Sequence, residues 1–152
     1  MADTQEILPA TRAQDTQVTG NVGLYYCCYE LSRRGWNVMP TARNARGIDI
    51  IAYRDNGHEF RGIQVKTLSK KYAVPLGSSL DKVMGDFWVV IRTDGDRPRA
   101  FVLTPEEVRA GAHRNVKDGR ESYWLEPRDY EKDVYQDEWE RISGRLPPTP
   151  AT

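Results

Sequence analysis

The chain has 152 residues, a length that can bury one sizeable core and that favours a single domain over two. Its 22 basic and 22 acidic side chains give a formal net charge of zero, which excludes long-range attraction of the whole molecule to polyanions, so any nucleic-acid binding requires a local basic surface. No apolar run approaches the roughly 20 residues of a membrane span, and the first residues lack the pattern of a secretory signal, so we expect a cytoplasmic location without membrane contact.

The pattern of cysteines and histidines excludes two classes of site. Cys27 and Cys28 are adjacent, a spacing that suits neither a disulfide framework nor a zinc ligand set, so they are interpreted as small core residues. His58 and His113 lie far apart in polar stretches. Neither histidine has a partner at metal-ligand spacing, and we expect both at the surface.

Residues 1–14 show no periodic pattern and are expected to form a flexible N-terminal arm. About residues 15–34 predict a helix, with glycine at position 35 as its terminating residue. Gly20 and Gly23 inside this helix suggest a close approach of its backbone to the sheet. We expect one broad buried face made of two neighbouring stripes, namely Val18, Val22, Tyr25 and Tyr29 beside Leu24, Cys28 and Leu31.

The next segment changes to an extended pattern. Residues 36–39 predict a short strand, and residues 40–46 predict a polar, basic loop. Residues 47–53 and 60–68 are rich in residues typical of strands, and the turn signal at residues 54–57 joins them into an antiparallel hairpin.

The second half of the chain adds shorter elements. A helix is expected from Ser78 or Ser79 to about Met84, followed by strands at residues 87–91 and 100–103. Residues 104–107 have the cap, proline and acidic first turn of another helix. The remaining apolar anchors, which we expect to pin a final helix onto the domain, are Tyr123, Trp124, Leu125, Tyr130, Tyr135 and Trp139.

The order of these elements predicts an α/β fold, a sandwich with a central mixed β-sheet flanked by helices. We expect a single domain over residues 15–143 and a disordered, proline-rich tail over residues 144–152.

Three side chains in the predicted hairpin carry the chemistry. Side chains alternate along a strand, so Gln64 and Lys66 point to the same face, and Asp49 lies on the preceding strand. A carboxylate with neighbouring oxygens suits a hard cation such as magnesium. A lysine beside it can orient or deprotonate an attacking water and offset the charge of a phosphate. Phosphodiester hydrolysis needs this combination.

This helix, followed by Gly47-Ile48-Asp49 and by Gln64-Val65-Lys66, resembles the PD-(D/E)XK nuclease superfamily, and within it the Mrr-like restriction endonucleases and archaeal Holliday junction resolvases. The resemblance covers roughly residues 18–91 and implies a restriction-endonuclease-like fold. It also implies that Asp49, Gln64 and the backbone carbonyl of Val65 bind Mg²⁺ or Mn²⁺, and that Lys66 serves catalysis.

One position departs from the family pattern. Active members often carry a glutamate directly after a glycine in the first helix, and here the pair is Gly23-Leu24. Glu30 lies six residues farther on, about 600° of helical rotation away, which makes it a poor substitute. With Gln64 neutral, Asp49 is the one formal charge of the inferred ligand set, so weaker metal affinity is expected.

Basic residues near the inferred site are candidates for nucleic-acid contacts. A phosphate-facing rim is one interpretation, and ordinary solvated loops are an equally good one, for Arg43, Arg46, Lys70 and Lys71. Tyr72 either stacks on a base or closes the core.

Two functional hypotheses from different classes follow. In the first, the protein is a Mg²⁺-dependent endonuclease that hydrolyses DNA as a homodimer, since duplex cleavage commonly requires two sites. In the second, the nuclease fold is a catalytically degenerate binding module for nucleic acid or for a protein partner, in defence or repair, with Asp49 and Lys66 as a structural ion pair. A P-loop or dinucleotide binder is set aside because no glycine-rich loop joins a strand to a helix.

Overall fold

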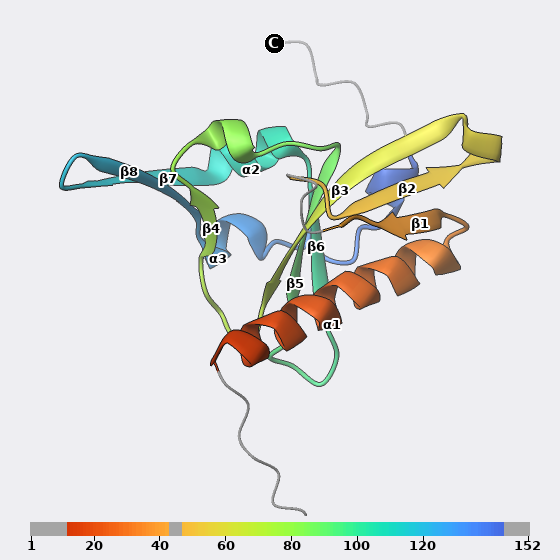
Figure 1. Ribbon diagram of the computed structural model, residues 1–152, viewed down its shortest axis with the longest axis horizontal. Coiled ribbons are helices and arrows are strands. Elements are labelled where there is room, and N and C mark those ends of the chain that lie inside the picture. Colours follow the sequence, from red (N-terminus) through yellow and green to blue (C-terminus); the bar gives the residue numbers. More distant parts are fainter. Residues whose placement is uncertain (1–11, 43–46, 145–152) are drawn as a thin grey trace, which may run out of the picture.

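The structure, a computed structural model, describes residues 12–42 and 47–144. Its centre is a five-stranded mixed sheet in the order β1-β2-β3-β5-β6 (Figure 1). Only β3 and β5 run parallel among its neighbours, and the other pairs are antiparallel. The predicted central mixed sheet is therefore confirmed. Its strands are β1 (Asn37–Pro40), β2 (Ile50–Arg54), β3 (Glu59–Leu68), β5 (Phe87–Arg92) and β6 (Arg99–Leu103).

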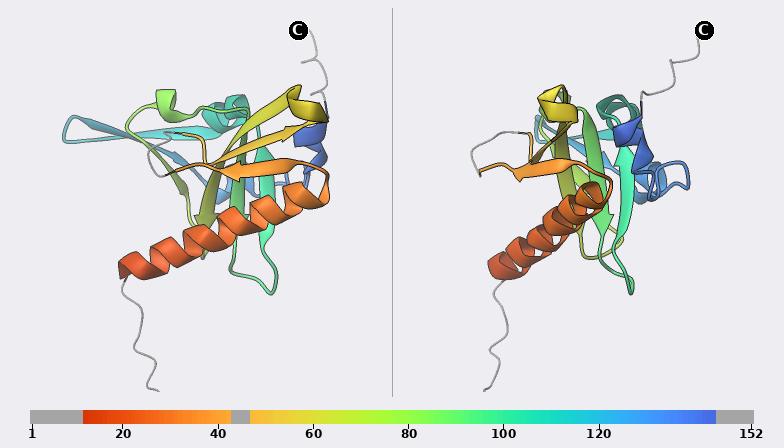
Figure 2. Two further views of the ribbon diagram at one scale, coloured as in Figure 1. Left: turned by 45° about the vertical axis from the view of Figure 1, so that its right-hand side comes forward. Right: turned by 90° about the vertical axis from the view of Figure 1, so that its right-hand side faces the viewer.

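Helix α1 (Arg12–Arg33) lies across one face of this sheet (Figure 2). Its buried side is formed by Cys27 and Leu31, with Leu24 and Cys28 packed partly against them. The prediction of one broad buried face is wrong for its other half, because Val18, Val22, Tyr25 and Tyr29 expose 59, 44, 62 and 58% of their surface. At 100° per residue the centres of the two stripes lie about 120° apart around the helix, and only the second stripe packs on the sheet.

The glycines of α1 explain how closely it approaches β3. A Cβ at Gly23 would lie 1.8 Å from Oγ1 of Thr67, so glycine is required there, as predicted. The same expectation is wrong for Gly20, which has no neighbouring atom within 4 Å of a Cβ. Gly35 follows the helix with a φ of 89°, which confirms it as the terminating residue.

The other face of the sheet is covered by a second sheet and a short helix. This sheet has three strands in the order β4-β8-β7 and packs beside α2 (Pro105–Gly111). Thr104 caps α2 in a reciprocal capping box with Glu107, as the sequence predicted. The expected helix after Ser78 or Ser79 is wrong, because only the 3-10 turn η2 (Leu80–Lys82) forms there. The strands are β4 (Val74–Gly77), β7 (Ala112–Lys117) and β8 (Arg120–Leu125).

Two aromatic anchors hold the last described segment against the domain. Tyr130 and Trp139 are buried, as expected, but the segment contains two short helices, α3 (Pro127–Tyr130) and α4 (Glu140–Ser143), instead of one final helix. Helix α1 begins at Arg12, inside the predicted arm. The rest of that arm and residues 145–152 lie outside the described residues. Within the described part of the chain no helix is long and apolar enough to cross a membrane.

Candidate functional site

Strand β3 directs alternate side chains to the two faces of the sheet. Ile63 and Val65 belong to the core beneath α1, and Thr67 meets α1 at Gly23. Gln64 and Lys66 point to the opposite face, where both line a cleft. The predicted same-face placement of Gln64 and Lys66 is confirmed.

The cleft lies between the central sheet and β4 and has a volume of about 720 Å³. Two of its lining residues, Lys66 and Lys82, are cations, and none is acidic. Such a lining attracts an anionic group even though the chain as a whole is neutral. The lining residues are Gly47, Gln64, Lys66, Pro75, Leu76, Gly77, Lys82, Met84 and Trp88.

An aromatic ring supports the lysine of the cleft. Lys66 Nζ lies 5.6 Å from the centroid of the Trp88 ring, at a distance typical of a cation–π contact. Trp88 is buried and its Nε1 donates to the carbonyl oxygen of Met84 at 3.0 Å, which fixes the ring. The Trp88 ring therefore supports Lys66 where this residue lines the cleft.

Asp49 stands immediately before β2, at the end of that strand's pairing with β3. Its backbone N–H donates to the carbonyl of Ile63 at 2.9 Å, and its Oδ2 accepts from the backbone N–H of Val65 at 2.7 Å. The last β2–β3 pair is Ile50 with Ile63, so the carboxylate occupies the place that a further strand residue would take beside Val65. In an extended strand the carbonyl of Val65 points to the same edge as its N–H.

The structure does not bring the three predicted residues together by direct bonds. Asp49 is absent from the lining of the cleft that contains Gln64 and Lys66. No ion pair between Asp49 and Lys66 forms among the described residues, since Asp49 bonds to Val65 and Lys66 lies over Trp88. The structural ion pair expected for a degenerate site is therefore wrong.

Gln64 carries an unusual feature, a buried side-chain oxygen without a hydrogen-bond partner among the described residues. Leaving such an oxygen unpaired costs about 1–3 kcal/mol. A cation or a donor from a ligand would satisfy it. Gln64 and Val65 are adjacent on β3. Gln64 supplies an amide oxygen, and Val65 is the residue whose backbone N–H is bonded to Asp49.

These oxygens fit a hard divalent cation in type, because carboxylate, amide and backbone carbonyl oxygens are the ligands that Mg²⁺ accepts. They are few, however. The described residues contain no group of three or more histidine, cysteine or acidic side chains placed to hold a metal. A cation held by these groups would have one carboxylate and neutral oxygens as its ligands.

The first helix contributes no acid to this region. Leu24, at the position where a glutamate is common, packs against the core. Glu30 is buried and bonds to Arg34, with Oε2 2.5 Å from Nη1. Glu30 therefore pairs within α1 and does not replace the glutamate that is missing at position 24.

Cys27 is too buried to act as a nucleophile. Burial raises the pKa of the Cys27 thiol well above its ordinary range, and nearby Cys28 and Asp49 add to the effect. Cys27 has no exposed surface. It is a core residue, as expected, and Cys28 is partly buried beside it.

The predicted basic rim is only partly described. Lys70 and Lys71 are exposed, and Lys71 Nζ lies 3.4 Å from Oε2 of Glu131. Arg43 and Arg46 lie outside the described residues. Tyr72 is 53% exposed, so it does not close the core.

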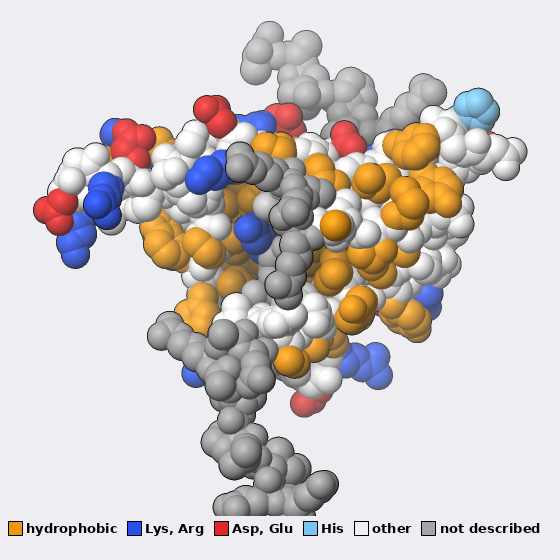
Figure 3. All heavy atoms as spheres, in the orientation of Figure 1, with side chains coloured by type: hydrophobic (Ala, Val, Ile, Leu, Met, Phe, Trp, Pro, Cys, Tyr) orange, Lys and Arg blue, Asp and Glu red, His pale blue; other side chains and the backbone are white. Residues whose placement is uncertain are grey.

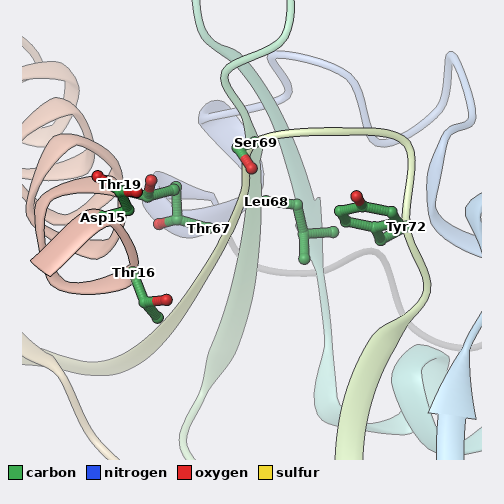
Figure 4. A pocket seen from close by; sticks show the side chains of 7 residues that line it. All are labelled: Asp15, Thr16, Thr19, Thr67, Leu68, Ser69 and Tyr72. Atoms are coloured by element: carbon green, nitrogen blue, oxygen red, sulfur yellow. The ribbon is translucent and has the colours of Figure 1, made fainter. Parts of the chain in front are cut away.

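Tyr72 instead borders a second, smaller hollow between α1 and the end of β3, with a volume of about 230 Å³ (Figure 4). Hydroxyl groups dominate its lining, and Asp15 is its one acidic residue. It shares no lining residue with the cleft of Lys66. The lining consists of Asp15, Thr16, Thr19, Thr67, Leu68, Ser69 and Tyr72.

Lys82 and the β4 wall of the cleft were missed by the sequence analysis. Strand β4 begins one residue after Ala73 and contains Pro75, which weakens any strand signal. Lys82 sits in η2, where its Nζ approaches Ser78 Oγ at 3.3 Å. Only the folded chain brings Lys82 to Lys66.

Comparisons with known proteins identify the fold. No protein-family model matches the chain, and no curated protein matches it in sequence. Among solved structures it is similar to a bacterial homing endonuclease, I-Ssp6803I, with a TM-score of 0.55 and 16% sequence identity. The match covers 84% of this chain and 92% of that one. At this identity the likeness establishes the architecture, so the chain has an α/β fold similar to that of a nuclease.

Proposed function

We propose that the protein is a Mg²⁺- or Mn²⁺-dependent endonuclease of the PD-(D/E)XK type that hydrolyses DNA phosphodiester bonds. The fold similarity to a homing endonuclease supports the reaction class. The observation that carries the proposal is the buried Gln64 oxygen, which has no partner among the described residues and stands next to the residue bonded by Asp49. The two lysines of the adjacent cleft suit a polyanionic substrate.

In this proposal the chain's own groups divide the work. Asp49, Gln64 and the carbonyl of Val65 would hold the cation, which supplies Lewis-acid activation of water and of the scissile phosphate. Lys66, supported on Trp88, orients the attacking water and offsets charge developing on the phosphate. Lys82 and the other cleft residues position the phosphodiester backbone.

The direct experiment is incubation of the purified protein with supercoiled, linear and branched DNA, with and without Mg²⁺ or Mn²⁺. Asp49→Ala and Lys66→Ala are run beside the wild type. We expect metal-dependent cleavage that both substitutions abolish. Cleavage that persists unchanged in either variant would assign the activity to a contaminant or to another site.

A second candidate function is a DNA-binding module without cleavage. The observation that favours it is the sparse ligand set, since the described residues contain no group of three or more acidic, histidine or cysteine side chains that could hold a metal. In that case the protein retains duplex in a mobility-shift assay, and neither metal produces nicked or linear product. Such a result would leave the fold and the cleft intact but remove the catalytic role of Lys66.

A homodimer is part of the endonuclease proposal, and the exposed stripe of α1 is a suitable contact for it. Figure 3 shows hydrophobic atoms along this helix. Val18, Val22, Tyr25 and Tyr29 fall within about 60° of one another around the helix axis. When two copies of α1 pair antiparallel about a two-fold axis, each valine faces a tyrosine of the partner, small against large. A self-complementary surface of this kind is what a two-fold dimer requires.

The charges at the ends of the stripe fit the same arrangement. Asp15 and Arg33 are both exposed, one at each end, so antiparallel pairing brings opposite charges together. One helix face per copy is a small interface, so we expect a concentration-dependent dimer. Sedimentation velocity should show Tyr25→Glu shifted to monomer and Val134→Glu, an exposed residue in the C-terminal segment, unchanged. A monomeric wild type at all concentrations would exclude the dimer.

A further inference from the structure

The β7–β8 hairpin extends away from the body of the molecule (Figure 1). Its turn is Asp118-Gly119, with φ values of 52° and 74°, as in the two-residue turns that hold hairpins tightly. Every β7 residue from His113 to Lys117 is exposed. A protruding hairpin with polar side chains on both faces adds little to the hydrophobic core. Packing therefore does not explain most of its length.

The two faces of this hairpin have different chemistry. Cross-strand partners share a face, and the register pairs His113 with Trp124, Asn115 with Ser122 and Lys117 with Arg120. This donor face, as we call these six residues, carries two cations, an amide, a hydroxyl, an indole and an imidazole. At its inner end His113 Nε2 lies 2.8 Å from Oδ2 of Asp129. A hollow of about 540 Å³ opens at its outer part, lined by Asn115, Lys117, Asp118, Arg120, Glu121 and Ser122.

Glu121, the one acid of the two strands, borders this hollow but belongs by register to the opposite face, where its charge is neutralised. There Glu121 forms an ion pair with Arg114 and accepts a hydrogen bond from the hydroxyl of Tyr123. Among the described residues, Lys117 and Arg120 have no ion-pair partner, although Asp118 stands in the turn between them. Two cations near the tip of the arm are thus available to a phosphate backbone or to base edges.

The donor face is continuous with the wall of the candidate cleft. Strand β4 pairs with β8 so that Pro75 lies opposite Trp124. Pro75 lines the cleft of Gln64 and Lys66. A nucleic acid seated with a phosphate in the cleft would therefore extend along the row that runs from Trp124 through Ser122 to Arg120.

We propose that the β7–β8 hairpin is a DNA-reading arm that places its donor face in the major groove beside the cleaved bond. The inference rests on the proposed endonuclease function and adds the element that recognises the substrate. A two-stranded β-ribbon fits the major groove, where arginine and lysine read guanine and asparagine reads adenine. Lys117 and Arg120 supply the cations, and Asn115 supplies the amide.

The test compares two double variants of equal charge change. Lys117→Ala/Arg120→Ala removes the two cations of the arm that have no ion-pair partner among the described residues. Arg97→Ala/Lys132→Ala removes two exposed cations outside the hairpin. Binding of a fluorescein-labelled mixed-sequence duplex is measured by anisotropy without divalent metal, over a range of salt concentrations, and cleavage at saturating DNA is measured separately.

We expect the arm variant to bind DNA about 10-fold to 100-fold more weakly than the wild type. The slope of log affinity against log salt concentration should become smaller by about two, and the affinity of the control variant should stay within about twofold of wild type. Methyl green, which occupies the major groove, should compete with the wild type more strongly than netropsin, which occupies the minor groove. Equal losses in both double variants, or binding that prefers single strands or RNA, would overturn the arm. A wild type that shows this binding pattern without cleavage would remove the proposed catalysis and leave the arm standing. Thermal unfolding of each variant confirms that it is folded.

Discussion

Replacing Asp49 by asparagine and by alanine separates the two roles assigned to one carboxylate. Asp49 Oδ2 accepts from the Val65 N–H at 2.7 Å, and asparagine keeps an oxygen that can accept the same bond. Alanine leaves this half-buried N–H without its partner, at a cost of about 1–3 kcal/mol. In a protein of 152 residues that corresponds to a melting temperature lower by roughly 2–10 °C. For asparagine we expect a loss of about 1 kcal/mol or less, because only the charge assistance disappears.

Cleavage activity should depend on the charge of residue 49, and stability should depend on its hydrogen bond from the Val65 N–H. Removing the one carboxylate of the inferred ligand set should lower metal-dependent cleavage of supercoiled DNA by at least about 100-fold in both variants. Urea unfolding and plasmid nicking are measured on the same preparations. An asparagine variant that cleaves like the wild type would reduce Asp49 to a strand-end hydrogen-bond acceptor. An alanine variant as stable as the asparagine variant would refute the role given to the Val65 bond.

Two further predictions concern the scaffold. Gly23→Ala should lower the free energy of unfolding by about 1–3 kcal/mol, because its Cβ would overlap a threonine of β3. Gly20→Ala should raise the free energy of unfolding by up to about 1 kcal/mol. Urea unfolding of both variants measures the contrast, and equal effects would contradict the packing of α1. Burial acts to raise the pKa of Glu107, but hydrogen bonds from the Thr104 backbone and Arg141 outweigh it and leave that pKa below its ordinary value. Glu107 therefore stabilises the fold above its unfolded-state pKa, and this contribution is lost as the pH falls through its folded-state pKa. Glu107→Gln should flatten the acid side of a plot of melting temperature against pH, and an unchanged slope there would contradict the assignment.

The features that the sequence predicted are those with local causes. Alternation along one strand places Gln64 and Lys66 on one face, whatever the rest of the chain does. Gly35 ends α1 and Thr104 begins α2, because caps are set by a few neighbouring residues. The hairpin of β2 and β3 follows from a turn signal between two β-branched runs.

The features that were missed depend on distant parts of the chain. Helix α1 has two apolar stripes about 120° apart, and periodicity does not tell which of them meets the sheet. Strands β7 and β8 lack an apolar alternation because much of the hairpin is solvated, so their pattern resembles a loop. The bond from Val65 to Asp49 forms because β2 begins at Ile50, so that Asp49 stands just outside the strand. A sequence pattern does not fix a strand boundary to within one residue.

Diffraction from crystals soaked in Mn²⁺, recorded at an energy where manganese scatters anomalously, shows whether Asp49, Gln64 and Val65 hold a cation. We expect an anomalous peak bounded by the Asp49 carboxylate, the Val65 carbonyl and the Gln64 side-chain oxygen, which has no partner among the described residues. Loss of this peak in Asp49→Asn crystals, with the strands unmoved, is the matching control. A protein that cleaves DNA with Mn²⁺ but shows its peak elsewhere, or none between these three oxygens, would contradict the assignment of the site.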